Sequence, residues 1–247
     1  MDDKNGQYIY AIVDAQHPPA EGLVGLGGVP VRKIVDEGLG AIVSALHRPK
    51  VRPERRNLSA HMQVLKRLMA DATILPLAFG NVATDDASVR VLLQRNHATL
   101  REQLDAVRGK LEMGLRVAWD VANVFDYFVS TRPDLRAARD NLGDVRKASR
   151  DQMIALGRFF EEVVNDERDR IYDEVAGILE SFGAEVHRNA PRGEREALNL
   201  ACLVERDRQS DFDRAIGEAA SHFDASYTFD ITGPWAPSSF VDMTLEV

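Results

Sequence analysis

The chain has 247 residues, of which 45% are hydrophobic and 28% are charged, so it is long enough to bury one large core or two of ordinary size. Its formal net charge of −8 argues against a general nucleic-acid binder, which needs a basic surface to displace phosphate counterions. The single cysteine, Cys202, excludes an internal disulfide and a cysteine-based zinc site, and its apolar surroundings indicate simple burial.

The start of the chain argues against export and membrane insertion. It carries acidic residues where a signal peptide is basic, and it lacks an apolar core segment. No apolar run approaches the roughly 18 residues that a membrane-spanning helix requires. We therefore expect a soluble, cytoplasmic protein with neither a membrane nor a nucleic acid as its partner.

Strands are expected first along the chain. Residues 8–13 (YIYAIV) are aromatic or β-branched on both faces, which is typical of a central strand covered on two sides. Residues 29–46 predict a hairpin with its turn at Asp36, Glu37 and Gly38. The proline-broken stretch 47–56 predicts a solvated loop, and its basic residues are Arg48, Lys50, Arg52, Arg55 and Arg56.

Two helices are expected next. The first is capped by Asn57 or Ser59. Leu58, Met62, Leu65 and Met69 are expected on one face of this helix. After a short extended segment that ends at Gly80, Thr84 is expected to cap a single helix that stops at Gly109. The buried stripe of this helix is Val89, Leu92, Leu93, Asn96, Leu100, Leu104 and Val107.

The second half of the chain begins with strict alternation. Residues 111–120 place their apolar side chains on one side, which predicts a half-buried strand. A charged, broken region around residues 131–144 leads into a long helix whose apolar stripe runs from Met153 to Phe182. The remaining segments are expected to be two strands, a helix and a closing strand, over residues 184–189, 196–205, 210–223 and 226–231.

From residue 111 the expected order is therefore β, α, β, β, α, β. This is the ferredoxin-like order, an antiparallel sheet with both helices on one face. Residues 1–109 predict the order β, β, β, α, β, α. We expect an α+β protein of two domains, an N-terminal α+β domain over residues 1–109 and a ferredoxin-like C-terminal domain over residues 110–247 with an extended tail over 233–247.

The sequence carries no motif for catalysis, cofactor binding or metal binding. The glycine-rich stretch 22–28 lacks the pattern of a phosphate-binding loop, and the six histidines lack metal-ligand spacing. His61 and His97 fall on expected helices, where interfacial or surface positions are expected. Glu167 replaces an apolar residue in a helical stripe, which indicates the edge of that stripe more than an acid catalyst. We expect no catalytic residue, no cofactor and no metal ion.

The stretch TGPWAPSSFV (232–241) is the most informative part of the chain. Pro234 and Pro237 lack backbone donors and fix φ, so residues 233–238 are expected to run extended outside any sheet interior. Trp235 lies between them, and placing it in a groove would bury a large apolar surface at little entropic cost. Residues 241–247 alternate again and predict a terminal strand.

The tail has two physical interpretations. It packs within the molecule and straps one domain to the other, or it is an edge that pairs with a partner strand. The strap is favoured because a free apolar strand would aggregate. Under either interpretation the candidate anchor or partner-contact residues are Gly233, Pro234, Trp235, Pro237 and Phe240.

Three stretches resemble a known family. YIYAIV at the start, LPLAFGNV (75–82) in the middle and TGPWAPSSFV near the end resemble the gas vesicle synthesis proteins F and L over essentially the whole chain. Members of that family usually carry arginine where this chain has Ala78, and proline and tyrosine where it has Ala236 and Ser238. These departures indicate a divergent member or a paralogue.

The resemblance implies a non-enzymatic accessory or minor structural protein of gas vesicle assembly, with an N-terminal α+β domain and a ferredoxin-like C-terminal domain. It implies that the chain binds the hydrophobic vesicle shell protein and other vesicle accessory proteins and limits aggregation during nucleation. Its expected location is the cytoplasm and the gas vesicle. The alternative is a small-ligand-binding or enzymatic protein that uses the ferredoxin-like sheet face as its pocket.

Overall fold

The computed structural model describes residues 6–17, 21–46, 50–143 and 148–242. The chain divides into two compact units. Unit 1 comprises Met1–Met113, Leu203–Arg206 and Gly233–Val247, and unit 2 comprises Gly114–Cys202 and Asp207–Thr232. Both units combine helices with a sheet, so the α+β class is confirmed. The domain boundary near residue 109 stays a prediction.

Unit 1 is built on a five-stranded sheet. Its strands are β1 (Gly6–Asp14), β2 (Val31–Asp36), β3 (Leu39–Leu46), β4 (Ile74–Pro76) and β5 (Val82–Ala83). The order is β2-β3-β1-β4, with β5 also pairing with β1, and all of these pairs are antiparallel. The expected hairpin is confirmed, because Asp36 pairs with Leu39 across the turn.

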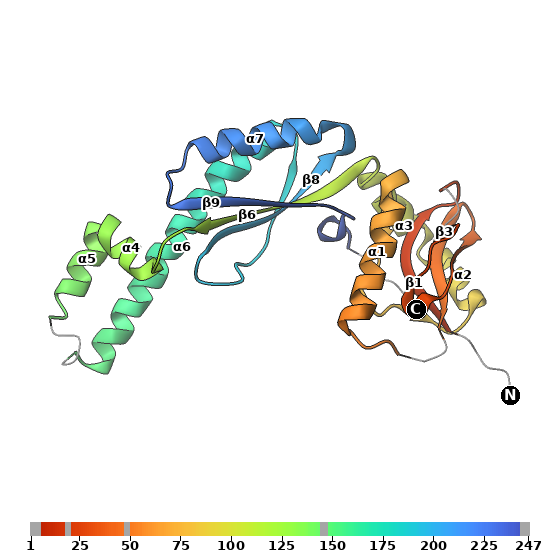
Figure 1. Cartoon of the computed structure of the whole chain (residues 1–247), viewed down its shortest axis with the longest axis horizontal. Helices are drawn as coiled ribbons and strands as arrows, with labels where there is room; N and C mark the ends of the chain where they lie inside the picture. The colour runs from red at the N-terminus through yellow and green to blue at the C-terminus, as the bar shows by residue number, and fades with distance from the viewer. Residues whose placement is uncertain (1–5, 18–20, 47–49, 144–147, 243–247) are drawn as a thin grey trace. The chain divides into compact units, whose positions relative to one another are not determined.

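Helices cover both faces of this sheet. These helices are α1 (Arg55–Asp71), α2 (Asp86–Arg95) and α3 (His97–Ala106), with short 3₁₀ turns η1 (Leu26–Gly28) and η3 (Ser238–Phe240) in the same unit. Figure 1 shows α1 on one side of the strands and α2 and α3 on the other. Residues 8–13 of β1 are therefore fully buried, as their two-sided apolar sequence predicts.

Three expectations for the helices of unit 1 are wrong. Helix α1 begins at Arg55 after Glu54, ahead of both expected caps, so Arg55 and Arg56 belong to a helix and not to a loop. Asp85, and not Thr84, caps α2, because its carboxylate accepts the backbone N–H of Ser88 at 2.8 Å.

The expected single helix up to Gly109 is in fact two helices, α2 and α3. The chain breaks at Asn96, whose φ of −103° and ψ of 12° are not helical. The Asn96 side chain donates to the carbonyl of Leu92 at 2.9 Å, the local hydrogen bonding by which asparagine competes with a continuous helix. The apolar stripe nevertheless reaches the core on both sides of the break.

Unit 2 contains most of a four-stranded sheet. Its strands are β6 (Lys110–Trp119), β7 (Glu185–Arg188), β8 (Glu196–Glu205) and β9 (Tyr227–Trp235), in the order β7-β8-β6-β9. Its helices are α4 (Val124–Thr131), α5 (Pro133–Asp140), α6 (Arg150–Ser181) and α7 (Gln209–Ser221), with a 3₁₀ turn η2 (Arg206–Arg208) before α7. Strands β6, β8 and β9 have residues in both units.

The main elements of unit 2 follow the expected order. Strand β6 is followed by α6, β7, β8, α7 and β9, and α6 packs against α7. The ferredoxin-like classification of this part stays a prediction. Helices α4 and α5 are additional. Helix α5 lies within the charged region around residues 131–144 that was expected to be broken, and α4 lies almost entirely before that region, where no element was predicted. Asn123 caps α4, and Pro133 starts α5 at a position where a missing N–H costs nothing.

The end of β9 differs from the expectation for the tail. The strand does not stop at residue 231 but continues through Pro234 to Trp235. A sheet edge tolerates proline because it needs no donor on its open side, and β9 is an edge strand next to β6. Of the terminal strand expected over residues 241–247, residues 243–247 lie outside the described residues.

Candidate binding groove

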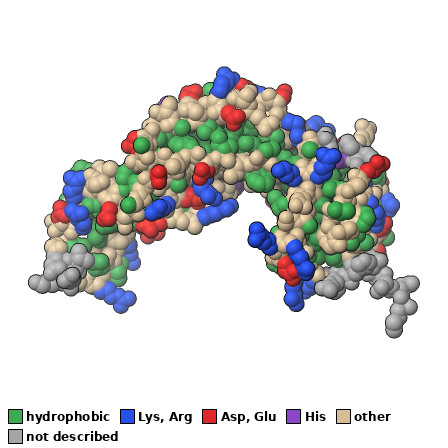
Figure 2. Space-filling model, viewed as in Figure 1, with side chains coloured by type: hydrophobic (Ala, Val, Ile, Leu, Met, Phe, Trp, Pro, Cys, Tyr) green, Lys and Arg blue, Asp and Glu red, His purple; other side chains and the backbone are tan. Residues whose placement is uncertain are grey.

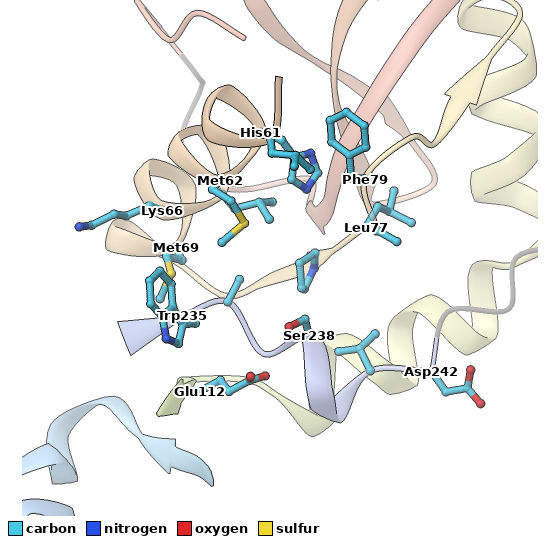
Figure 3. A pocket seen from close by; sticks show the side chains of 16 residues that line it. His61, Met62, Lys66, Met69, Leu77, Phe79, Glu112, Trp235, Ser238 and Asp242 are labelled. Carbon is cyan, nitrogen blue, oxygen red and sulfur yellow. The ribbon is translucent and has the colours of Figure 1, made fainter. Parts of the chain in front are cut away.

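A groove of about 480 Å³ opens on unit 1. One wall is α1, the floor is the segment 76–79 after β4, and the other wall is the segment 235–242 at the end of the described chain. Figure 3 shows side chains from these three segments directed into the same space. The groove joins residues that are far apart in sequence and that belong to one compact unit.

The α1 wall is the apolar face that the sequence predicts. Leu58, Met62, Leu65 and Met69 follow at helical spacing and all line the groove. Leu65 and Met69 are buried, but Leu58 is 39% exposed and Met62 is 45% exposed. The second half of this apolar face therefore belongs to the core, and its first half is open to solvent along the rim.

The floor is held by a buried hydrogen-bonded cluster. The Tyr8 hydroxyl accepts the backbone N–H of Gly80 at 3.1 Å and lies 3.0 Å from Nδ1 of His61, to which it can donate. The rings of Tyr8, His61 and Phe79 contact one another edge-on or tilted. His61 is only 4% exposed, so of the two expected positions the surface one is wrong, and the ring packs between α1 and β1.

Burial also sets the protonation of this cluster. Desolvation lowers the pKa of His61, and a hydrogen bond to the Leu77 backbone offsets part of that effect. Desolvation raises the pKa of Tyr8 to about 12, against the hydrogen bond from Gly80. A neutral imidazole and a neutral phenol therefore make up a polar but uncharged support beneath the groove at neutral pH.

The opposite wall is fixed by Glu112 of β6. Its buried carboxylate accepts the backbone N–H of Ser239 at 2.8 Å and the Ser239 hydroxyl at 2.9 Å. We call this pair of bonds the Glu112–Ser239 clasp. Next to it, Ala236 is buried and Phe240 and Val241 pack against the hydrophobic core of unit 1. Two charge-assisted bonds and apolar packing thus hold the segment 236–241 in place.

The five candidate tail residues have different positions. Pro237 is buried and Phe240 is half-buried against the core, whereas Pro234 is exposed. Trp235 is 40% exposed and lines the groove. Gly233 has a φ of 120°, and a Cβ there would lie 3.1 Å from both the Glu112 carbonyl oxygen and the Met113 sulfur. The groove therefore includes Trp235 but not the other four.

Sequence reasoning missed Glu112 and the groove itself. Glu112 occupies a position on an alternating strand that faces away from the apolar side, and no local signal shows that Ser239 would cover it. The exposure of Leu58 and Met62 was missed for a different reason. An apolar helical face has the same sequence pattern whether it is buried by its own chain or left for a partner.

Glu167, the one carboxylate singled out in the sequence, lies in unit 2. It forms an ion pair with Arg170 at 2.7 Å and accepts a hydrogen bond from the Tyr227 hydroxyl at 3.3 Å. Arg170 also pairs with Glu174, so Glu167 belongs to a charge network along α6. Among the described residues, no group of three or more His, Cys, Asp or Glu side chains is placed to hold a metal ion.

The described part of the chain contains no helix with the length and apolar character needed to span a membrane.

Known proteins match this chain over nearly its whole length. The sequence model of the family described as gas vesicle synthesis protein GvpL/GvpF matches residues 6–242. The chain is 31% identical over 242 residues to gas vesicle protein F of Streptomyces sp. (strain CB03234), with 95% of this chain and 99% of that protein covered. It is 28% identical over 278 residues to gas vesicle protein L of the same strain, with 97% and 94% covered.

A solved structure shares the fold. The crystal structure of the gas vesicle protein GvpF from Anabaena sp. PCC7120 superposes with a TM-score of 0.85 at 26% sequence identity. The match covers 97% of this chain and 99% of that chain.

Proposed function

Because this chain belongs to the gas vesicle synthesis protein GvpL/GvpF family, its role is related to gas vesicles, and we propose that it is a non-enzymatic accessory protein of their assembly. It binds the hydrophobic shell protein and other vesicle proteins during nucleation and limits their aggregation. It acts in the cytoplasm and at the growing vesicle. This proposal requires an apolar contact surface and no reactive group.

The observation that carries the proposal is the exposed apolar groove of unit 1. Leu58, Met62 and Trp235 leave large apolar side chains open to solvent around one concave site. Exposed apolar patches of this kind mark sites for protein partners, and a shell protein that is itself hydrophobic offers the complementary surface. We propose Trp235 as a partner contact and Pro237 and Phe240 as the anchors that hold its segment in place.

The alternative, a small-ligand or catalytic site, has less support. The groove volume falls in the range of ligand pockets. However, the Glu112 carboxylate is engaged by Ser239, and the His61 ring is engaged by Tyr8. The groups most suited to acid–base chemistry are thus used in holding the walls and floor.

An aggregation assay with the shell protein tests the proposal. The shell protein is diluted from denaturant into buffer with the purified chain, and light scattering and co-sedimentation are followed. We expect the chain to delay scattering and to remain with the shell protein in the soluble fraction. An unrelated acidic protein of similar size is the control. Failure of the chain to bind the shell protein or to delay its aggregation contradicts the proposed function.

A further inference from the structure

We propose that the groove of unit 1 binds an amphipathic helix with an aliphatic ridge and with carboxylates along the flank that faces α1. The inference deepens the proposed function, on which the identity of this partner as a vesicle protein rests. It is carried by two independent observations, the spacing of the apolar wall and the charge of its exposed side.

The apolar wall fits a helix packed alongside α1. Leu58, Met62, Leu65 and Met69 stand at positions i, i+4, i+7 and i+11, so they form a ridge along the helix axis. Helix-in-groove recognition uses the same spacing on the bound helix. The two methionines are unbranched and adapt their shape to an aliphatic side chain. Trp235 faces this ridge from the opposite wall, as Figure 3 shows next to Met69.

The exposed side of α1 is basic in a protein with a net charge of −8. Arg55, Arg56, Lys66 and Arg67 are all exposed on this helix, and Lys66 lines the groove. Figure 2 shows Lys and Arg side chains where α1 lies in Figure 1. Arg55 and Lys66 are eleven residues apart and lie on one flank of the ridge, whereas Arg67 lies on the opposite side of α1. Within the described ranges, Arg56 pairs with Glu54, whereas Arg55 and Lys66 form no ion pair with a carboxylate. Two exposed cations next to an apolar ridge select an acidic partner.

The distribution of charge across the groove restricts the rotation of the bound helix about its own axis. Asp242 lines the groove on the wall opposite α1, as Figure 3 shows, so among the described residues the cations of the groove lie on the α1 side alone. The carboxylates of a bound helix are therefore expected on the flank that faces Arg55 and Lys66. The charges thus favour one rotation of the bound helix about its axis, and contact with the apolar ridge fixes how deeply its leucines enter the groove.

Binding of designed peptides to the full chain tests this inference. The probe is a helical peptide of about 18 residues with leucines at i, i+3, i+4 and i+7 and glutamates along one flank. Three matched peptides carry lysine in place of glutamate, serine in place of leucine, or the same residues in an alternating order that suits a strand. Binding is followed by the emission of Trp235, which should shift to shorter wavelength as the ring leaves water. A Trp235→Phe variant should lose this signal.

We expect only the peptide with leucines and glutamates to bind tightly. Added salt should weaken its binding, because salt screens the charges. Lys66→Glu together with Arg55→Glu should weaken this peptide at least about tenfold and strengthen the lysine peptide. Arg158→Glu, on the exposed side of α6 in unit 2, is the charge control and should change neither affinity. Equal binding of the glutamate and lysine peptides overturns the charge assignment.

A second variant tests the apolar ridge. Met62→Gln keeps the length of the side chain and should weaken the glutamate peptide about tenfold. Val91→Gln, at an equally exposed apolar position on α2, should leave it unchanged. If both variants lose affinity for the glutamate peptide equally, or if neither loses affinity, the groove is not the binding site. Tight binding of the alternating peptide overturns the helical partner in favour of a strand.

Failure of this inference is distinguishable from failure of the proposed function. If the wild-type chain binds the shell protein but none of the peptides, the partner chemistry is wrong and the function stands. If the glutamate peptide binds in the groove and the shell protein does not bind at all, the groove assignment stands and the proposed function is wrong.

Discussion

The two tryptophans of the chain occupy opposite kinds of surroundings. Trp119 ends β6 inside unit 2, where it is 1% exposed. Phe128 packs edge-on against its ring at 5.2 Å, and the Arg168 guanidinium lies 5.5 Å from its centre. Trp235 ends β9, next to β6 in the same sheet, and 40% of it faces solvent at the groove of unit 1.

This difference separates two uses of a large aromatic side chain. Trp119 is enclosed by its own chain, so its apolar area contributes to folding. Much of the Trp235 residue remains uncovered, although Ala236 and Pro237, which follow it, are buried. Because the segment that carries it is already ordered, an exposed ring can bury its apolar area against a partner with little loss of conformational entropy on binding. The contrast predicts separable effects on stability and on binding.

The largest effect is expected for Trp119→Ala. Removing a fully buried ring should lower the free energy of unfolding by about 3–5 kcal/mol, because it leaves a cavity lined by Phe128 and Arg168. Urea denaturation followed by circular dichroism measures this loss. A loss below about 1.5 kcal/mol would contradict this difference between Trp119 and Trp235. It would mean that the structure around Trp119 collapses into the cavity or that the site is open to water.

A smaller effect is expected for the Glu112–Ser239 clasp. Glu112→Ala removes both acceptors and should cost roughly 2 kcal/mol, since the half-buried Ser239 loses the partner of its N–H and of its hydroxyl. Hydrogen exchange of the amides at residues 236–241 should rise with it. Glu112→Gln is the matched control, because its amide can accept from the N–H and donate to the hydroxyl, and it should recover most of the loss. Equal exchange in all three proteins would show that packing alone holds this segment.

The change at Trp235 should be smaller again. Trp235→Ala should cost roughly 1 kcal/mol of stability, because the part of the ring that faces solvent contributes little to folding. Calorimetry of this variant beside Trp119→Ala gives the comparison directly. A cost similar to that of Trp119→Ala would mean that Trp235 is a structural anchor, as its two flanking prolines led us to expect.

The smallest effect concerns pH. The pKa of His61 is lowered in the folded protein, so the unfolded chain takes up a proton first as pH falls below 6.5. The stability that His61 contributes is complete above that pH and is lost progressively below it. Between pH 7.5 and 6.0 this loss is at most about 0.8 kcal/mol, the limit set by the unfolded histidine.

His61→Gln isolates this contribution. It removes the titrating ring and leaves the other histidines unchanged, so the difference between the two stability–pH curves belongs to His61. We expect the stability of the wild-type chain relative to the variant to fall as pH falls, because only the wild-type unfolded state takes up this proton. Parallel curves from pH 7.5 to 6.0 would show that the imidazole under the groove is not protected from protonation.

Local sequence patterns predicted most of the fold. The two-sided apolar run of β1, the alternation of β6 and the long stripe of α6 each appear where periodicity placed them. The break at Asn96 was missed because the apolar stripe continues across it, so periodicity alone shows no interruption. The extension of β9 through Pro234 was missed because proline is excluded from a sheet only where its N–H would be needed.

The groove was less predictable than the fold. Leu58, Met62 and Trp235 were all noticed in the sequence, but their meeting depends on contacts between residues far apart along the chain. Glu112 and Ser239 show the same limit, because neither residue has a local pattern that points to the other. Pattern reasoning identifies which faces are apolar, and only the tertiary arrangement decides which of them the chain covers itself.

The two walls of the groove are also synthesised at different times. Helix α1 leaves the ribosome early in synthesis, whereas the wall formed by residues 235–242 is made much later. A nascent chain thus has the ridge of Leu58 and Met62 but not yet the facing tryptophan. The complete groove arises only when residue 242 is free to fold, so translation itself delays recognition until the rest of the described chain has been made.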